Sequence, residues 1–350
     1  MDGHLESVLA DWDGEFVHIA RDEPSGAWMF IAIHSTRLGP GAGGTRLNTY
    51  ASAGDALVDA TRLAAAMTLK MAVADMPMGG AKAVLAVPGE LDPEQRRGLL
   101  LHHADNVNTL GGRYRTGPDM NTTSADMDVL GERTPYAFGR SRAKGGSGSS
   151  APDTAIGVFH GIRASCAHAF GSDDLSERTV LVQGVGAVGE PLAELLTKAG
   201  AGVLLSDIDP TRAMAVAERL GGRTVPPDEV IGTECDVYAP CATGGVLDVQ
   251  AIPQLCCRVV AGAANNPLGE VADGDRLRDA GILYAPDFVI NGGGVLHLIG
   301  YEALGWTAQR VEQALVAIGA TLTEIYRAAD AQGISTELAA EQLAAARLAR

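Results

Sequence analysis

The sequence predicts an α/β fold in two domains, the second of which contains a doubly wound parallel sheet. The chain has 350 residues, which corresponds to about two domains at roughly 100–200 residues each. In its second half, short apolar stretches alternate with segments of helical spacing, a pattern typical of parallel sheets covered by helices. A glycine- and serine-rich stretch over residues 144–152 separates the halves and is typical of a linker.

The first half is expected to mix short strands, helices and glycine-rich loops. Residues 14–35 predict two strands around a turn at 22–26, because apolar and β-forming residues flank a Pro-Ser-Gly sequence. The segments that follow are predicted as a glycine-rich loop (38–46), a helix (52–74), a loop (78–82), a strand (83–87), a helix (92–109) and a strand that runs into a loop (114–121).

The second half shows a more regular alternation. The continuous apolar run Thr179–Gln183 is typical of a parallel strand buried on both faces. Further strands are expected at 202–206, 235–239, 259–261 and 281–285, with helices at 155–169, from 189 to about 199, and at 307–349. We therefore expect a first domain over residues 1–143, a second over 144–330, and a C-terminal helix over 331–350 that could pack back on the first domain.

Composition excludes several classes of protein. Lys and Arg number 27 and Asp and Glu number 43, so the formal net charge is −16. Such a chain lacks the basic surface that nucleic acids and anionic membranes attract, and neither is expected as a partner. The five cysteines show no zinc-site spacing, so we expect reduced thiols and no metal. An acidic N-terminus and the absence of an uncharged apolar run of ~18 residues predict a cytoplasmic protein.

A glycine motif in the second half predicts a dinucleotide site. Gly184, Gly186 and Gly189 form a GxGxxG pattern that follows an apolar strand and opens a helix. Asp207 ends the next strand, 18 residues after Gly189. This is the context of a Rossmann domain, in which the pyrophosphate lies at the helix N-terminus. Asp207 would accept both ribose hydroxyls and repel a 2′-phosphate, which favours NAD over NADP, although the nearby Arg212 leaves NADP open. The alternative is a glycine-rich turn without a cofactor.

Two lysines and an aspartate are candidate catalytic residues. Lys70 lies late in the helix predicted over residues 52–74, and Lys82 follows the small residues of Met78–Ala81. A lysine in a tight, desolvated loop can have a lowered pKa and act as a base. Asp119 ends a Thr-Gly-Pro-Asp sequence. Taken singly, the lysines could be surface charges and Asp119 could serve only the turn.

These residues carry a resemblance to the glutamate/leucine/phenylalanine/valine dehydrogenase family over about residues 10 to 345. Within that family the chain resembles most closely the actinobacterial type of phenylalanine dehydrogenase. Eight segments match in the family's order: Leu38–Arg46, Met67–Ala72, Pro77–Lys82, Thr116–Asp119, Gly184–Gly189, Ala239–Cys241, Ala261–Asn266 and Ala285–Phe288.

The resemblance implies an oxidative deamination in which an L-amino acid, NAD and water give a 2-oxo acid, NADH and ammonium. Lys70 would hold the substrate α-carboxylate together with Gly44 and Asn266. Lys82 would take a proton from the attacking water, and Asp119 would move protons to and from the amine. The hydride transfer would need a closed cleft from which bulk water is excluded.

The remaining candidate site residues follow from the same resemblance. Those expected near the substrate are Ala42, Gly117, Met120, Asn121 and Val295. Those expected at the cofactor are Arg46, Ser150, Thr154, Gly184, Val185, Gly186, Ala187, Val188, Gly189, Asp207, Ile208, Arg212, Cys241, Ala242, Ala264, Asn265 and Asn266.

The substrate is expected to be a bulky apolar L-amino acid, with phenylalanine first. Glutamate enzymes of the family carry a lysine where this chain has Ala42, and an unpaired buried carboxylate there would be costly. Ala42 and Gly117 are both small, which leaves room for an aromatic ring. Departures from the family pattern at Ala81, Pro267 and Gly292 also touch the substrate side.

Several alternatives to this function remain. They are a leucine, valine or glutamate dehydrogenase of the same family, a ketone reductase that uses no ammonia, and a non-catalytic NAD-binding regulator or redox sensor. The family's members are homo-oligomers, so at least a dimer is expected.

Overall fold

The computed structural model describes residues 12–242 and 244–350, and the chain divides into two compact units. Unit 1 contains the chain up to Ser149 together with Leu298–Gly305 and Arg347–Arg350, and unit 2 contains Ser150–His297 and Trp306–Ala346. The first division therefore falls between residues 149 and 150, six residues after the predicted end of the first domain. At the C-terminus, residues up to Ala346 belong to unit 2 and Arg347–Arg350 belong to unit 1.

Unit 1 is built on a mixed six-stranded sheet of order β1-β2-β5-β3-β6, in which β4 also pairs with β5. β1 and β2 form an antiparallel hairpin, and β2 is antiparallel to β5, whereas β3, β4 and β6 join through parallel pairings. The strands are β1 (Phe16–Asp22), β2 (Ala27–Ser35), β3 (Gly41–Ala42), β4 (Thr45–Asn48), β5 (Gly79–Ala86) and β6 (Tyr114–Arg115).

Three helices of unit 1 begin at capping residues that the sequence supplies. They are α2 (Ala53–Val73), α3 (Pro93–Thr109) and α4 (Ser124–Leu130). The side chain of Ser52 accepts a hydrogen bond from the backbone of Asp55 at the start of α2. Asp92 forms a capping box with Gln95 at the start of α3, where Pro93 occupies the first turn.

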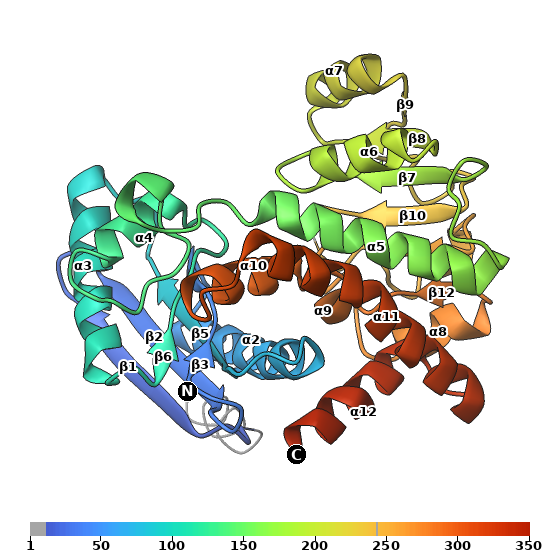
Figure 1. Cartoon of the computed structure of the whole chain (residues 1–350). Coiled ribbons are helices and arrows are strands. Elements are labelled where there is room, and N and C mark those ends of the chain that lie inside the picture. The colour runs from blue at the N-terminus through green and yellow to red at the C-terminus, as the bar shows by residue number, and fades with distance from the viewer. Residues whose placement is uncertain (1–11, 243) are drawn as a thin grey trace. The chain divides into compact units, whose positions relative to one another are not determined.

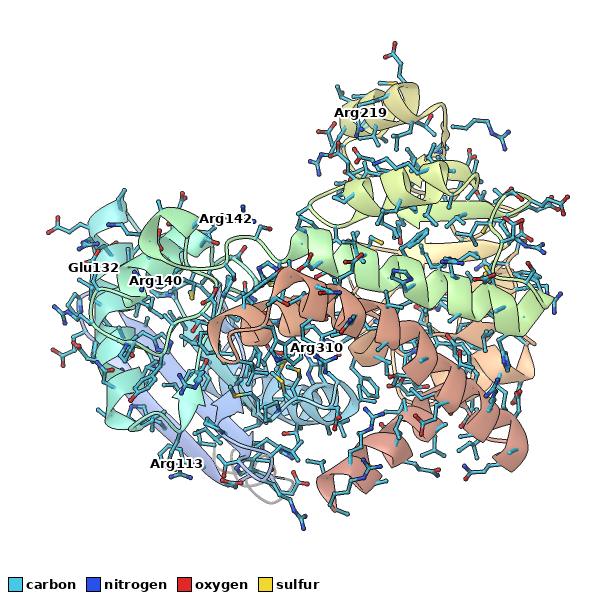
Figure 2. The ribbon with its side chains drawn as sticks, in the orientation of Figure 1. Arg113, Glu132, Arg140, Arg142, Arg219 and Arg310 are labelled. Atoms are coloured by element: carbon cyan, nitrogen blue, oxygen red, sulfur yellow. The ribbon has the colours of Figure 1, made fainter. Side chains whose placement is uncertain are left out.

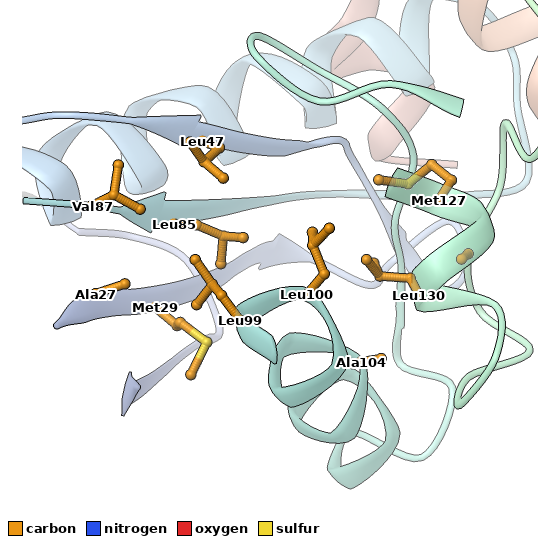
Figure 3. Packing of buried hydrophobic residues seen from close by; sticks show 11 residues of the cluster. Ala27, Met29, Leu47, Leu85, Val87, Leu99, Leu100, Ala104, Met127 and Leu130 are labelled. Carbon is orange, nitrogen blue, oxygen red and sulfur yellow. The ribbon is translucent and has the colours of Figure 1, made fainter. Parts of the chain in front are cut away.

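The alternation of side chains along β2 and β5 separates two apolar layers. Met29 and Leu85 pack against Leu99 and Leu100 of α3 and against α4 (Figure 3). Residues whose side chains point to the other face of the sheet, such as Val84, pack against α2 instead. The sheet of unit 1 therefore has α2 on one face and α3 with α4 on the other.

The predicted loop over residues 78–82 is wrong, because residues 79–82 form the first half of β5. A Cβ added at Gly80 would lie 2.1 Å from the backbone nitrogen of Thr68 on α2, so α2 can approach the strand only at a glycine. Glycines usually indicate loops, and here they permit close packing of a helix on a strand.

Unit 2 contains an entirely parallel six-stranded sheet of order β12-β11-β10-β7-β8-β9. The strands are β7 (Thr179–Gln183), β8 (Gly202–Ser206), β9 (Arg223–Thr224), β10 (Val237–Pro240), β11 (Val259–Val260) and β12 (Leu283–Tyr284). Numbered along the chain, this is the strand order of a Rossmann domain, with the reversal between β7 and β10. The predicted doubly wound parallel sheet is confirmed.

The helices of unit 2 connect and cover these strands, as Figure 1 shows. They are α5 (Ala151–Phe170), α6 (Gly189–Lys198), α7 (Pro210–Leu220), α8 (Asp273–Asp279), α9 (Asp287–Ile290), α11 (Ala308–Gln332) and α12 (Thr336–Leu348), while α10 (Gly293–Glu302) runs from unit 2 into unit 1. Arg219 of α7, labelled in Figure 2, pairs with Glu190 and Glu194 of α6.

The single helix predicted over residues 307–349 is two helices. Gly333 ends α11 in the left-handed conformation, with φ of 69°, and α12 begins three residues later. The tail is rich in Ala and Leu on both sides of this position, and that pattern concealed the break. Among the described residues, no helix is long and apolar enough to cross a membrane.

Candidate active site

Strand alternation places two basic residues of unit 1 on the face of the sheet that α2 covers. Lys82 lies on β5 two residues before Val84, and Arg46 of β4 is the register partner of Val84. Because Val84 packs against α2, side chains of the same parity point toward that helix. Asp59 on α2 and Asp119, four residues after β6, complete a charged group that comes from four separate parts of unit 1.

Lys82 and Asp119 form a buried ion pair. The Lys82 Nζ donates to Asp119 Oδ1 at 2.6 Å, and the two side chains are 6% and 20% exposed. Burial lowers the pKa of the Lys82 ammonium, and Asp119 only partly offsets this effect. Burial opposes ionisation of Asp119, but Lys82 and then Arg46 outweigh it and hold the pKa of that carboxyl well below its usual range. The pair thus combines a lysine that loses its proton more readily than usual with a carboxylate that stays ionised.

Arg46 links this pair to a second carboxylate. Its Nε donates to Asp119 Oδ2 at 2.9 Å and its Nη1 donates to Asp59 Oδ2 at 2.9 Å. Burial would lower the pKa of Arg46, but the two carboxylates raise it. The Tyr50 hydroxyl donates to the same Asp59 oxygen at 2.7 Å, and burial with this bond raises the pKa of Tyr50. Arg46 therefore fixes Asp119 from the side opposite Lys82.

The backbone around Asp119 is held by local contacts. The Asp119 N–H donates to the Thr122 hydroxyl at 2.8 Å, and that hydroxyl donates to the Thr45 carbonyl at 2.7 Å. Asn121 adopts a left-handed φ of 59° and donates from its side chain to the Leu47 carbonyl at 3.0 Å. A Cβ added at Gly44 would lie 2.8 Å from Asp119 Cβ. Of the predicted substrate residues, Asn121 thus shapes the loop, and Gly44 allows β4 to approach it.

An uncharged hydrogen-bond network lies behind the charged group. Thr45 shares its hydroxyl with His103 Nε2 at 2.9 Å and with the Thr116 hydroxyl at 2.6 Å, and Tyr114 donates to the Gly43 carbonyl at 2.8 Å. Complete burial lowers the pKa of His103 to about 3, so its imidazole is neutral. This network holds β3, β4 and β6 together without adding charge beside Asp119.

The other predicted substrate residues of unit 1 occupy varied environments. Lys70 is half-buried in the last turn of α2. Ala42 is buried in β3, opposite Gly80 of β5. A Cβ added at Gly117 would lie 3.5 Å from Leu298 Cδ1, in ordinary contact, and Met120 is 50% exposed.

In unit 2, the glycine motif forms the turn between β7 and α6. Gly184 has a φ of +92°, which side-chain-bearing residues rarely adopt. A Cβ added at Gly189 would lie 1.8 Å from the Gly184 carbonyl oxygen, whereas one added at Gly186 would meet no atom within 4 Å. Gly189 is therefore required by packing, and the space at Gly186 fits the approach of a pyrophosphate to the backbone.

Asp207 follows β8 and ties that strand to the motif. Its Oδ2 accepts from the Val185 N–H at 2.9 Å and its Oδ1 accepts from the Asp209 N–H at 2.9 Å. Each oxygen keeps a lone pair, so the carboxylate can still accept two ribose hydroxyls. Arg212 lies 3.6 Å from Asp207 and 3.7 Å from Asp209, and Ile208 is 92% exposed.

A second loop of unit 2 carries Asn265 and Asn266 after β11. Asn266 has a left-handed φ of 48°, and its N–H donates to Asp287 Oδ2 at 2.9 Å. The Asn291 side chain donates to Asn265 Oδ1 at 2.9 Å. Ala264 precedes these two asparagines and is buried. The segment around α9 thus fixes the loop that holds three predicted site residues.

The other predicted cofactor residues of unit 2 cluster in two places. A Cβ added at Gly184 would lie 2.8 Å from Ala242 Cβ, and Cys241 precedes Ala242, so both face the motif at the end of β10. Burial raises the pKa of the Cys241 thiol to about 12. The Ser150 and Thr154 hydroxyls both lie near Gly294, at 3.4 and 3.2 Å from its hypothetical Cβ. Val295 follows on α10 and is half-buried. The remaining motif residues, Ala187 and Val188, lie directly before α6.

Four residues that support these sites were not predicted: Asp59, Tyr50, Asp287 and Asn291. Asp59 could have been predicted, because it lies 11 residues before Lys70 on one helix. This spacing is close to three turns and puts both residues on one face of the helix. Asp287 lies in the segment Ala285–Phe288, which was singled out without a role. Tyr50 carries no such signal. In the described part of the chain, no group of three or more His, Cys, Asp or Glu residues could hold a metal ion.

Comparisons with known proteins match both halves of the chain to one family. Residues 17–136 match the model for the dimerisation domain of Glu/Leu/Phe/Val dehydrogenase, and residues 205–350 match the model for glutamate/leucine/phenylalanine/valine dehydrogenase. The chain is 40% identical to a leucine dehydrogenase of Bacillus cereus over 97% of this chain and 92% of the relative. It is 41% identical to a valine dehydrogenase of Streptomyces virginiae over 95% and 93%.

Solved structures show the same likeness over the whole chain. L-tryptophan dehydrogenase from Nostoc punctiforme superposes with a TM-score of 0.84 at 35% identity, covering 98% of each chain. The leucine-bound hetero-hexameric glutamate dehydrogenase from Thermus thermophilus gives a TM-score of 0.74 at 25% identity, covering 99% of this chain and 93% of that one.

The predicted family is confirmed, but these relatives do not support the closer resemblance to phenylalanine dehydrogenase, because their names are leucine, valine, tryptophan and glutamate dehydrogenase. Pocket-lining residues that differ by one or two carbons give too little signal to rank such subfamilies. The two-domain fold, the family matches over both halves and the named relatives lead to one conclusion: the chain is an amino acid dehydrogenase and belongs to the Glu/Leu/Phe/Val dehydrogenase family.

Proposed function

We propose that the protein catalyses the reversible, NAD-dependent oxidative deamination of a bulky apolar L-amino acid to its 2-oxo acid and ammonium. The observation that carries this proposal is the buried pair of Lys82 and Asp119, joined at 2.6 Å. Deamination needs a base for the attacking water and a group that moves protons at the substrate nitrogen. The lowered pKa of Lys82 suits the base, and the ionised carboxylate of Asp119 beside it is a proton acceptor for the substrate nitrogen.

Each member of the charged group has a part in this chemistry. Lys82, as the free amine, takes a proton from the water that attacks the iminium carbon of the oxidised substrate. Asp119 passes protons to and from the substrate nitrogen. Arg46 occupies the second oxygen of Asp119, which orients the first oxygen toward Lys82. Lys70 binds the substrate α-carboxylate through charge-assisted hydrogen bonds.

The residues of unit 2 fit a dinucleotide. The space above Gly186 and the N-terminus of α6 suit the pyrophosphate, and the free lone pairs of Asp207 suit the adenosine ribose. The negative charge of Asp207 favours NAD over NADP. When bound, NAD accepts a hydride from the substrate Cα. Ser150 and Thr154 hold the nicotinamide amide.

The substrate class follows from the residues near the catalytic group. Position 42 is a buried alanine without charge, so a glutamate side chain would have no partner there. A methyl group at Gly117, two positions before Asp119, would make only an ordinary contact, so there is space beside this residue. Small residues at both positions favour phenylalanine.

A second candidate substrate is a branched aliphatic amino acid. Its support is the 40–41% identity, over almost the whole chain, to proteins named leucine and valine dehydrogenase. One methylene in an apolar pocket is worth only about 1–3 kcal/mol, so the two candidates differ in preference and not in chemistry.

The test is an initial-rate screen of the L-amino acids with NAD and with NADP, together with the reverse reaction in the presence and absence of ammonium. We expect NADH formation with apolar amino acids, and a reverse reaction that depends on ammonium. A kcat/KM for leucine or valine above that for phenylalanine would assign the second candidate. Preference for glutamate, or reduction of the 2-oxo acid without ammonium, would overturn the proposal.

The protein is also expected to form a homo-oligomer. Residues 17–136 match a dimerisation-domain model, and the Thermus thermophilus relative is described as a hetero-hexamer. Light scattering on the purified chain would test this, and a monomer at all concentrations would contradict it.

A further inference from the structure

Two cysteines of unit 2 lie opposite each other at the amino ends of neighbouring strands. Strands β10 and β11 are parallel, with Val237 paired to Val259. Cys235 and Cys257 each lie two residues before these paired valines. The Cys235 N–H donates to the Cys256 carbonyl at 3.1 Å, which joins the two chain segments beside the two cysteines.

The two strands that begin just after the cysteines are spaced as a disulfide requires. Neighbouring strands lie about 4.7–4.9 Å apart, and disulfides join Cα atoms about 4.4–6.8 Å apart. Both residues lie two positions before β10 and β11 begin, where the bond from Cys235 to Cys256 holds the two segments together. Both side chains also pack against the same apolar cluster, which includes Leu181 and Tyr238.

The two thiols already interact. Cys257, followed by burial, raises the pKa of Cys235, whereas Cys235 lowers the pKa of Cys257. Both are half-buried free thiols. Of the other three cysteines, Cys166 is buried, Cys241 lies at the opposite end of β10, and Cys256 is exposed.

We propose that Cys235 and Cys257 form a reversible intramolecular disulfide when the protein meets a peroxide. The Cys257 thiolate attacks one peroxide oxygen, the O–O bond breaks, and the leaving hydroxide is protonated to water, which leaves a sulfenic acid on Cys257. The Cys235 sulfur then attacks the Cys257 sulfur and the S–O bond breaks. The second hydroxide takes the Cys235 proton and leaves as water. Two thiols lose two electrons, and one hydrogen peroxide becomes two waters.

The bridge would join β10 and β11 at the ends remote from the predicted cofactor loops. Cys241 follows β10 and Ala264 follows β11, at the carboxyl ends of the two strands. The disulfide would close a ring from residue 235 to residue 257 and restrict the unfolded chain. Oxidised protein is therefore expected to resist thermal unfolding better than reduced protein, without loss of the groups that bind NAD.

The test treats the intact protein with hydrogen peroxide, removes the excess, and counts thiols after unfolding. Digestion without reductant then maps any bridge by mass. We expect the loss of two of the five thiols, a peptide pair that joins Cys235 to Cys257, and full recovery with dithiothreitol. Cys256→Ser is the matched control, because its exposed thiol neighbours the pair, and it should leave the bridge intact.

Single variants assign the order of the two steps. Cys235→Ser should prevent the bridge and leave a sulfenic acid on Cys257 that a 1,3-diketone reagent labels, whereas Cys257→Ser should give neither bridge nor labelled Cys235. A bridge between Cys256 and Cys257, a bridge between chains, or survival of all five thiols would overturn the proposal. Oxidation of Cys235→Ser and Cys257→Ser at equal rates would overturn the assigned order.

Discussion

The two sites of the protein are built in opposite ways. In unit 1 the reactive groups come from α2, β4, β5 and the segment after β6, and ion pairs between residues up to 73 positions apart hold them. In unit 2 the core of the proposed cofactor site is one turn of six residues plus Asp207, and backbone geometry shapes it. The proposed catalytic group is thus assembled by the tertiary fold, whereas the proposed dinucleotide site is encoded locally.

Removing Asp119 should therefore affect stability more than removing Lys82. Asp119→Asn leaves Lys82 buried without its carboxylate, and breaking a buried pair in this way costs about 3–5 kcal/mol. Lys82→Met leaves Asp119 paired to Arg46 and should cost less. The double variant, Asp119→Asn with Lys82→Met, has no buried lysine left unpaired. It should therefore be more stable than Asp119→Asn, but it should remain inactive. Chemical unfolding of the three variants measures this, and an equal loss in both single variants would contradict the account.

In the glycine motif, the stability lost on each glycine substitution should depend only on what the added methyl group contacts. Gly189→Ala places a methyl group 1.8 Å from the Gly184 carbonyl, so we expect a loss of stability of about 1–3 kcal/mol together with weaker NAD binding. Gly186→Ala meets no atom within 4 Å and should weaken NAD binding with little change in Tm. Calorimetry with NAD and thermal melts without it separate the two effects. Equal Tm values for the variants would show that packing does not explain Gly189.

Cofactor preference should depend on a single charge. Asp207→Ser removes the carboxylate that disfavours a 2′-phosphate and keeps a hydroxyl near the Val185 N–H. The ratio of kcat/KM for NAD to that for NADP should fall toward one. A wild-type enzyme that prefers NADP, or a ratio that the variant leaves unchanged, would remove Asp207 from the ribose site.

The charged group should also respond to carboxylates that do not touch the substrate. Asp59 is among the groups that raise the pKa of Lys82. Asp59→Asn removes that charge, the pKa of Lys82 falls further, and the free amine is present at lower pH. The rising limb of kcat/KM against pH should consequently move to lower pH by a small amount. Asp105→Asn, on the exposed side of α3, is the control and should leave the limb in place. Movement of the limb to higher pH would contradict the assignment to Lys82.

The same contrast explains what the sequence could predict. Strands β7 and β8, the GxGxxG turn and Asp207 were identified because each depends on neighbours in sequence. The glycines of 79–80 were assigned to a loop because the contact that requires Gly80 lies on Thr68, in another element. Likewise Lys82 and Asp119 were named individually, but the bonds of Arg46 to Asp119 and Asp59 arise only when β4, β5 and α2 pack together. Arg46 was predicted to bind the cofactor, and that role stays a prediction.

The most direct test of the account is a single-turnover measurement on Lys82→Met, with NAD affinity measured on the same sample. If Lys82 is the base and the cofactor site is independent of it, NAD should bind as in the wild type, and the deamination rate should fall about 10²–10⁴-fold. A rate within about tenfold of the wild type would contradict the catalytic role of Lys82. A parallel loss of NAD binding would contradict the independence of the two sites.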